Sequence, residues 1–417
     1  MACRIAPTNT PGAYAWLHVE MFYNPNQVRR FGNQNFGDEV FGDQGGSGAP
    51  EWTDITEFVG DLSLTRGQQR PAAFTPADTL TFTAVDPLGN FLTWVPPQSL
   101  ASPTIGTPCR AGWSIGTDTA PGGTVRWMTT TIVDQIDELA DVPERSLTVS
   151  CLGAKSLLAT PLFFPDRPRE SAQTRIAAVL ADIGYPYPVV YDPIMSTIEL
   201  EADDGGTFRD GVAAFASTVI EEAANSCGLQ TYTDVDGTIL FATVGFRESG
   251  PPGFVVGNCD EPGIDVIANW IQYRMDALEV LNVVQVVNRL DPTRSAEAID
   301  PTSVAIYGRR ADGYGFPLTT VNQTGTVAQQ IADQILAETA NIVNRVEGLQ
   351  ANTLTDPRWW DIFTELTVFD AFTVRRLEPV ADEFYAQMIG FSLTVQPNGA
   401  EIIIHTATPQ GTDPFTP

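Results

Sequence analysis

Carboxylates are the most numerous residues in this sequence that could do chemistry, and two short stretches hold them close together. Asp234-Val235-Asp236-Gly237 has the first residues of a calcium-binding loop, but the later ligands and the closing glutamate are missing. Asp203-Asp204-Gly205-Gly206 is typical of a solvated turn. A pair of carboxylates could also hydrolyse a glycosidic bond, but 51 acidic residues make chance pairs unavoidable. We therefore assign the first stretch to a hairpin turn and nominate no catalytic or metal-binding residue.

Histidine and cysteine form no catalytic or metal-binding pattern either. We expect His18 to lie in a strand and to face solvent or a partner, and His405 lies in a predicted strand far from any Ser or Cys motif. A hydrolytic triad is therefore not predicted. The sequence contains no CxxC pair, no Gly-rich phosphate loop, no GxSxG and no HExxH, so neither an enzyme nor a bound cofactor is predicted. We expect free thiols at Cys3, Cys109, Cys151, Cys227 and Cys259.

The composition describes a folded, strongly acidic protein of two or three domains. The 417 residues carry 51 acids against 23 bases, a formal net charge of −28. Because phosphate contacts require clustered Lys and Arg, this charge argues against nucleic-acid and anionic-membrane partners. Lys155 is the only lysine, and arginine supplies every other base. No apolar run approaches the ~18 residues of a membrane-spanning helix, and the first residues lack the apolar segment of a secretory signal.

Residues 1–160 predict a first β domain. Residues 14–23 are rich in aromatic and branched side chains, while 62–67 and 80–85 alternate apolar and polar residues as half-buried strands do. Residues 24–50 are rich in Gly, Asn and Asp and predict a surface loop. Several short strands separated by turns favour a barrel or a sandwich.

Residues 161–255 switch to helical spacing and predict a small α+β module. Ser171 is a candidate N-cap for a helix that Gly184 ends, with apolar residues at helical spacing between them. A second helix is predicted to start at Thr207, where an acidic residue three positions later completes a capping-box pattern. A hairpin over 229–241 is predicted to turn at its Asp-Gly pair.

Residues 256–408 predict a second β domain with an inserted helix near 326–341. The predicted strands lie at 280–288, 365–369, 372–375, 384–395 and 401–408. Residues 409–417 are rich in Pro, Gly and Thr and predict a flexible tail. The predicted fold class is therefore mainly β with α+β: two β domains flank one α+β module.

Taken in order, four stretches resemble the tail-hub family of siphophages, relatives of the baseplate hub of contractile phages. Residues 52–59 followed by 62–67 resemble the start of the first β domain in minor tail proteins of phages that infect actinobacteria. Residues 228–241 are similar to the hairpin after the family's central helix. The third stretch is the most specific: Val283-Val-Gln-Val, then Asp300-Pro-Thr-Ser-Val-Ala-Ile-Tyr-Gly, then a helix. The fourth, 388–395 with 402–406, resembles the family's terminal pair of strands.

The resemblance implies a structural protein of the tail tip with two hub-type β-barrel domains per chain. Three chains would close a pseudo-sixfold ring that adapts a sixfold tail tube to a threefold tip and guides DNA exit. The expected partners are the other copies of a homotrimer and the distal tail, tape-measure and fibre or tip proteins of the same phage. No stable nucleic-acid binding and no membrane insertion are expected. The chain is expected in the virion, after assembly in the host cytoplasm, where disulfides rarely persist.

Two other functions stay open at this point. The hexameric distal tail ring shares its barrel ancestry with the hub but usually lacks the central helical module. A cell-wall hydrolase or a glycan-binding module of the tail is a more distant alternative. An obligate interface between copies would bury ~2,000 Å² or more. Its candidate aromatic anchors, each of which could also belong to a domain core, are Trp16, Trp94, Trp127 and Trp359.

Overall fold

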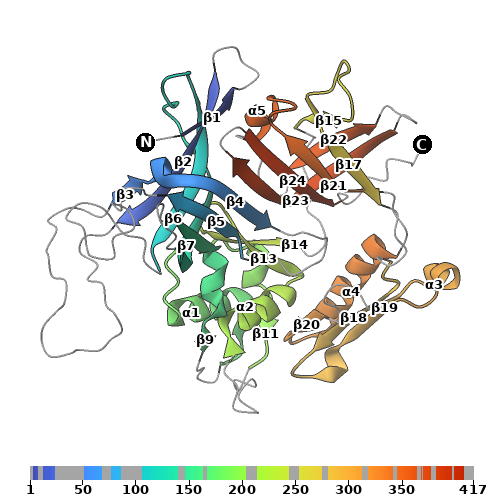
Figure 1. Cartoon of the computed structure of the whole chain (residues 1–417). Coiled ribbons are helices and arrows are strands. Elements are labelled where there is room, and N and C mark those ends of the chain that lie inside the picture. Colours follow the sequence, from blue (N-terminus) through green and yellow to red (C-terminus); the bar gives the residue numbers. More distant parts are fainter. Residues whose placement is uncertain are drawn as a thin grey trace, which may run out of the picture. The chain divides into compact units, whose positions relative to one another are not determined.

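The computed structural model describes most of the chain, and Figure 1 labels most of its helices and strands. The described residues are 3–7, 13–23, 51–67, 77–85, 106–139, 146–162, 167–202, 214–243, 253–274, 280–311, 318–340, 345–363, 368, 370–376, 382–396 and 399–407. They belong to two compact units, which we describe separately. Unit 1 contains residues 1–63, 79–152 and 395–398, and unit 2 contains residues 64–78, 153–394 and 399–417.

Unit 1 is a run of strands paired in the order β1-β2-β6-β7-β8-β5, with β3 also paired to β2. These strands are β1 (Cys3–Pro7), β2 (Tyr14–Tyr23), β3 (Glu51–Asp54), β5 (Thr79–Val85), β6 (Pro108–Gly116), β7 (Arg126–Leu139) and β8 (Ser146–Gly153). Strand β4 (Val59–Gly67) begins in unit 1 and ends in unit 2. The prediction that this part of the chain is built from strands is confirmed.

Alternating side chains explain the strands of unit 1. In β5, Leu80 and Phe82 are at most 1% exposed, whereas Thr81 and Thr83 beside them are half-buried. Strand β8 repeats the pattern, with every second residue buried. Because successive side chains of a strand point to opposite faces, one face of β5 and one face of β8 build the core.

His18 in β2 is buried, which corrects the expectation that it faces solvent or a partner. Its Nε2 lies 2.8 Å from the Ser114 Oγ on β6. Burial lowers the pKa of His18, although the carboxylates of Asp54 and Glu20 act in the opposite direction. The sequence pattern did not reveal this burial, because both faces of β2 are covered. Trp16, on the same face as His18, is only 9% exposed.

The four cysteines whose side chains are described are free, as predicted. Cys109, Cys151 and Cys227 are buried, and Cys259 is half-buried. Contact with the Cys151 thiol, followed by burial, raises the pKa of Cys109, and burial raises the pKa of Cys227 to about 12. The Cys109 and Cys227 thiols are therefore protonated at neutral pH and unreactive while buried. The side chain of Cys3 lies outside the described residues.

Unit 2 begins with a helical module, residues 153–243. Its elements are the 3₁₀ helices η2 (Ala154–Ala159) and η3 (Pro193–Ser196), the helices α1 (Ala172–Asp182) and α2 (Ala216–Asn225), and the strands β9 (Pro161–Leu162), β10 (Glu170–Ser171), β11 (Glu199–Leu200), β12 (Ala214–Phe215), β13 (Leu229–Thr233) and β14 (Ile239–Thr243). Apolar residues of α1, α2 and the hairpin β13–β14 form one core. The predicted N-cap is confirmed, because the Ser171 Oγ accepts a hydrogen bond from the Thr174 amide at 3.2 Å. Gly184, at φ +64, follows α1 as predicted.

Helix α2 begins at Ala216, so the prediction of a start at Thr207 is wrong. Ala214 and Phe215 pair with β9, which fixes an extended backbone directly before the helix. Phe215 is therefore an N-cap residue and 47% exposed, not part of the apolar stripe. The predicted capping box lies in residues 203–213, outside the described residues.

A second part of unit 2, residues 280–340, is called the α4 module here. It contains β18 (Val283–Asn288), the 3₁₀ helix η6 (Pro292–Arg294), β19 (Ala296–Ile299), α3 (Pro301–Tyr307), β20 (Leu318–Thr320) and α4 (Gly325–Thr339). The apolar face of α4 packs on β18 and β19 in a small core. The predicted helix near 326–341 is confirmed by α4, while α3 was not predicted. No helix of the described residues, α4 included, is long and apolar enough to cross a membrane.

The remaining strands of unit 2 form the strand module, although the last two residues of β23, Val395 and Gln396, belong to unit 1. They are β15 (Val255–Gly257), β16 (Val266–Ile267), β17 (Trp270–Arg274), β21 (Arg345–Asn352), β22 (Ala371–Arg376), β23 (Asp382–Gln396) and β24 (Gly399–Ala407). They pair in the order β16-β15-β22-β23-β24-β21-β17. Two residues, Ala268 and Asn269, join β16 to β17; the first amide donates to Gly257 and the second to Gln350. The chain thus passes directly from one end of this order to the other.

Helix α5 (Trp359–Phe363) supplies aromatic core to the strand module. Trp359 and Trp360 are 0% exposed, and the Trp359 Nε1 donates to the Ile267 carbonyl at 2.7 Å. The Trp359 ring also meets the rings of Phe254 and Phe363. Trp359 is therefore a core residue, and the alternative of an interface anchor is wrong. The strand predicted at 365–369 falls almost wholly outside the described residues.

Candidate functional site: buried charges and a polar joint in unit 2

The acidic stretch from Asp234 to Gly237 is a hairpin turn, as predicted. The Asp236 Oδ1 accepts from the Thr238 amide at 2.9 Å, and the Gly237 amide donates to the Asp234 carbonyl. Gly237 has φ +87, a conformation that favours glycine. Among the described residues, no three His, Cys, Asp or Glu side chains are grouped to hold a metal ion. The other acidic stretch, at 203–206, lies outside the described residues.

A cluster of buried charges, which sequence reasoning missed, lies where β4 enters unit 2. Arg66 and Asp78 are 5% and 4% exposed, and the Arg66 Nε is 3.3 Å from the Asp78 Oδ2. The Arg66 Nη2 donates to the Thr233 carbonyl at 3.0 Å and lies 3.4 Å from the Asp234 Oδ1. Gly67 must be glycine here, because at φ +77 a Cβ would lie 2.4 Å from the Ile389 carbonyl oxygen.

Lys155 adds a second buried cation to this cluster. It is 5% exposed, and its Nζ donates to the Thr231 carbonyl on β13 at 3.0 Å. Its distance to the Glu221 Oε1 on α2 is 4.0 Å, so the carbonyl is the closer contact. Arg66, Asp78, Lys155 and Glu221, together called the charge cluster, join β4, η2, α2 and the β13–β14 hairpin.

Burial dominates the electrostatics of the charge cluster. It raises the pKa of Asp78 to about 6, although the guanidinium of Arg66 and the ammonium of Lys155 oppose the shift. Burial also lowers the pKa of Lys155 to about 8, against the influence of Glu221 and Asp78. The charges of Asp78 and Lys155 are each stabilised by their neighbours less than they are penalised by losing water, as expected for buried ion pairs.

We expect Asp78 to give the protein a distinctive pH dependence. In the folded chain the pKa of Asp78 is about 6 instead of its usual 3.8. Between these two pH values the folded state therefore binds the proton more tightly than the unfolded chain does. Its contribution to the free energy of unfolding should therefore fall by about 2 to 3 kcal/mol as the pH rises from about 4 to about 7. Urea unfolding of the wild type and Asp78→Asn across this range isolates that contribution. If the difference in the free energy of unfolding between the two proteins did not change with pH, the prediction would be contradicted.

Lys155, the only lysine, should resist amine reagents in the folded protein. A succinimidyl ester at neutral pH should label the α-amino group alone, because the Nζ is buried and bound to the Thr231 carbonyl. After unfolding in urea, peptide mass spectrometry should find label on Lys155 as well. Equal labelling of Lys155 in folded and unfolded protein would show that the charge cluster is open to solvent.

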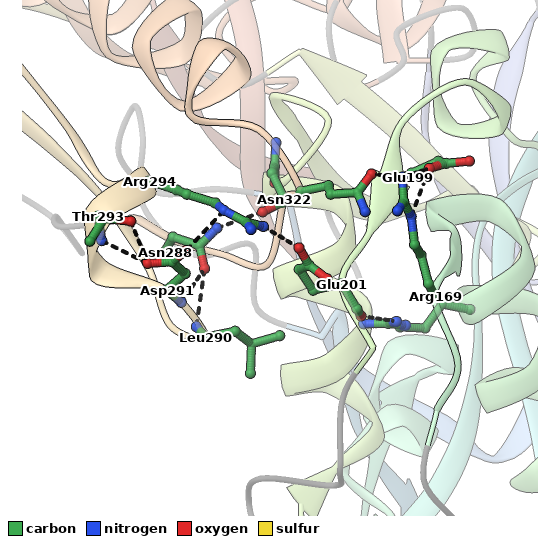
Figure 2. Close-up of polar contacts among 11 residues, drawn as sticks. Arg169, Glu199, Glu201, Asn288, Leu290, Asp291, Thr293, Arg294 and Asn322 are labelled. Atoms are coloured by element: carbon green, nitrogen blue, oxygen red, sulfur yellow. Dashed lines mark hydrogen bonds and ion pairs between the residues drawn. The ribbon is translucent and has the colours of Figure 1, made fainter.

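A polar joint connects the helical module to the α4 module inside unit 2 (Figure 2). Leu200 and Asn322 form an antiparallel bridge, with the Glu201 amide donating to the Val321 carbonyl at 3.0 Å. The Val321 side chain enters the core of the helical module. The Val321 amide donates to the Ser226 Oγ at 2.9 Å, directly after α2. The segment after β20 is therefore bound to the helical module through β11 and the end of α2.

Side chains complete the polar joint on both sides of that bridge. The buried Asn322 Nδ2 donates to the Ser226 carbonyl at 2.7 Å, and the Asn288 Nδ2 donates to the Asn322 carbonyl at 2.7 Å. Arg289 contacts both carboxylate oxygens of Glu222, and Arg294 contacts Glu201, as Figure 2 shows for the second pair. Asn322, which is 1% exposed, is thus a buried structural residue.

Unit 1 carries an aromatic stack that is a candidate contact surface. The guanidinium carbon of Arg110 lies 4.1 Å from the ring centre of Trp52 and 3.9 Å from that of Trp127. The Arg110 Nε and Nη2 also donate to the Glu20 Oε2 at 2.9 and 2.6 Å. Trp52 and Trp127 are both half-buried, so Trp127 stays a predicted interface anchor. Trp16 is largely buried, and Trp94 lies outside the described residues.

The comparisons with known proteins come from structure alone, because no family model and no curated protein matches the sequence. A tail protein from Neisseria meningitidis MC58 aligns over 94% of this chain and 96% of its own, at 14% identity and a TM-score of 0.56. The chain has a tail-protein fold. The 43 kDa tail protein of prophage MuSo2 from Shewanella oneidensis aligns over 86% of this chain and 95% of its own, at 12% identity and a TM-score of 0.52. This tail-protein fold extends over both units and every module described above.

Proposed function

We propose that this chain is a structural protein of a phage tail and not an enzyme. The observation that carries the proposal is the extent of the fold likeness, which takes in nearly all of this chain and nearly all of each tail protein. A module shared among unrelated proteins would align over one part only. Fold alone does not establish function, so the position of the protein in a virion has to be measured.

The more specific proposal is the hub of a siphophage tail tip, in a phage that infects actinobacteria. Three copies would form a ring that adapts a sixfold tube to a threefold tip, bound to the distal tail, tape-measure and fibre or tip proteins after assembly in the host cytoplasm. Two features support it. The chain contains two units rich in strands, so three copies would present six, and it contains the helical module that the distal tail ring usually lacks.

A role in guiding DNA exit follows from the same placement. Each copy has a formal net charge of −28, so a ring of three would repel the duplex as it passes. We therefore expect no retention of double-stranded DNA at physiological salt in a filter-binding assay. Tight binding would count against a position on the exit path.

The test is a reconstruction of intact tails without imposed symmetry, together with mass spectrometry of purified particles. We expect three copies of this chain in one ring at the tip. Six copies in one ring would favour the hexameric distal tail ring instead. A chain absent from the particles would refute the structural role. Clearing in a host cell-wall zymogram would favour the hydrolase alternative, and a clear glycan-array hit would favour the glycan-binding alternative.

A further inference from the structure

Helix α3 displays apolar side chains to solvent instead of burying them. Of its seven residues only Ser303 is buried, while Ile306 is 64% exposed. Ile299, at the end of β19 just before the helix, is 44% exposed. A helix this short is not stable on its own, and most helices gain their stability from a packed apolar face. Other contacts must therefore hold α3 in place.

Polar contacts hold α3 from both ends. The Asp300 Oδ1 caps the first turn by accepting from the Thr302 and Ser303 amides at 2.8 and 3.0 Å, and Gly308 ends the helix at φ +77. The fully buried Asn282 donates from its Nδ2 to the Ser303 Oγ and the Gly308 carbonyl, and its Oδ1 accepts from the Arg310 amide. A buried asparagine thus fixes a helix whose apolar residues remain available, which lowers the entropy lost on binding.

The strand register places α3 at the free end of the α4 module. Strands β18 and β19 are antiparallel, with Val286 opposite Ala296 and Val283 opposite Ile299. The polar joint, with Asn288 and Arg294, lies beyond the first pair, and α3 follows the second pair. Helix α3 therefore extends from the end of the hairpin that is opposite the polar joint.

Two arginines follow α3 and add basic side chains to this surface. Residues 301–311 contain Arg309 and Arg310 and no acid, in a chain whose formal net charge is −28. Arg309 is exposed, and its Nη2 lies 3.4 Å from both carboxylate oxygens of Glu297. The other nearby acid, Asp300, accepts from the amides of the first turn of α3. We call Ile299, Ile306, Arg309 and Arg310 the α3 patch.

A complementary surface lies on the helical module. Val190 and Ile194 are 55% and 43% exposed, with Asp192 between them. The Val190 amide donates to the Ile239 carbonyl, which brings this loop beside the turn that contains Asp236. Residues 183–199 and 229–243 contain no basic residue. We call Val190, Asp192, Ile194 and Asp236 the acidic loop. It combines exposed apolar residues with acids, where the α3 patch combines them with arginines.

We propose that the α3 patch of one copy docks on the acidic loop of the next copy of this chain. The proposal rests on the ring assembly proposed above and adds the surfaces that form it. The two surfaces differ, so the contact is head-to-tail, and contacts of that kind close into rings when their rotation permits. Ile306 is the central apolar residue, and Arg309 faces the acids of the neighbour.

The first test measures the copy number of the chain in tails assembled from mutated genes. Ile306→Asp should abolish its incorporation or prevent tail assembly, while Leu354→Asp, at an equally exposed residue (62%) of the strand module, should leave the copy number unchanged. Circular dichroism of each purified variant should show a folded chain. Full incorporation of Ile306→Asp would overturn the docking proposal but leave the structural role intact. Absence of the wild-type chain from tails would overturn both.

The second test locates the contact directly in assembled tails. With Cys3 and Cys259 replaced by serine, a chain carrying Ile194→Cys and Ile306→Cys should be joined to its neighbours by a short bis-maleimide. A matched chain carrying Leu354→Cys and Ile306→Cys should not. Equal cross-linking of the two chains, or none in the first, would overturn the proposal. Arg309→Glu should weaken self-association of the purified chain by about tenfold, and less at high salt.

Discussion

Replacing Arg66 with alanine should lower the free energy of unfolding by about 3 kcal/mol at neutral pH. Removal of the guanidinium leaves the Asp78 carboxylate buried without its 3.3 Å partner and the Thr233 carbonyl without its donor. The loss is limited because Asp78, whose pKa is already about 6, can take up a proton. Urea unfolding followed by circular dichroism measures the change.

Arg309→Ala is the matched control for Arg66→Ala. The Arg309–Glu297 pair has the same chemistry, but its side chains are 57% and 37% exposed. Surface ion pairs contribute at most about 1 kcal/mol, so the control should unfold almost as the wild type does. The loss for Arg66→Ala should also shrink at pH 5, where Asp78 is mostly protonated. Equal effects of the two substitutions at pH 7 would contradict the burial of the charge cluster.

Replacing Trp359 with alanine should lower the free energy of unfolding by about 3 to 5 kcal/mol, the largest effect we expect from any single substitution. The change leaves a cavity between the rings of Phe254 and Phe363 and removes the donor to the Ile267 carbonyl. The thermal midpoint, read by circular dichroism, should fall by several degrees.

Trp270→Ala is the control for Trp359→Ala, since it removes the same side chain from a position that is 42% exposed. It should cost no more than about 1 kcal/mol. If Trp359→Ala lowered the free energy of unfolding no more than this control does, the assignment of Trp359 to the core of the strand module would be contradicted.

Helix-capping and strand-alternation rules correctly predicted the elements that depend on neighbouring residues alone. Ser171 and Gly184 delimit α1 because an N-cap hydroxyl and a left-handed glycine act within one turn of the helix. The alternation in β5 placed Leu80 and Phe82 in the core for the same reason. Helix α3 could have been found as well: Asp300-Pro301 is an N-cap followed by proline at the first helical position, and Gly308 ends the helix.

Long-range pairing accounts for what the sequence did not predict. Arg66 and Asp234 are far apart in the sequence, so no spacing rule could join them. One signal was available: Lys155 is the only lysine and stands in a run of small and apolar residues, as a buried base would. The start of α2 depended on the pairing of β12 with β9, and the burial of His18 on a contact with β6.

Neither unit is a continuous stretch of the chain, and this restricts where related genes can recombine. Unit 2 takes in residues 64–78, far upstream of its main part at 153–394, while β4 runs from one unit into the other. A single genetic crossover between residues 78 and 153 would combine an Arg66 and Asp78 from one parent with a Lys155 and Glu221 from another. Such a recombinant would bring together halves of a buried charge cluster that had diverged separately. We expect exchange between related genes to preserve 64–394 as one block, and breakpoints inside it to be selected against.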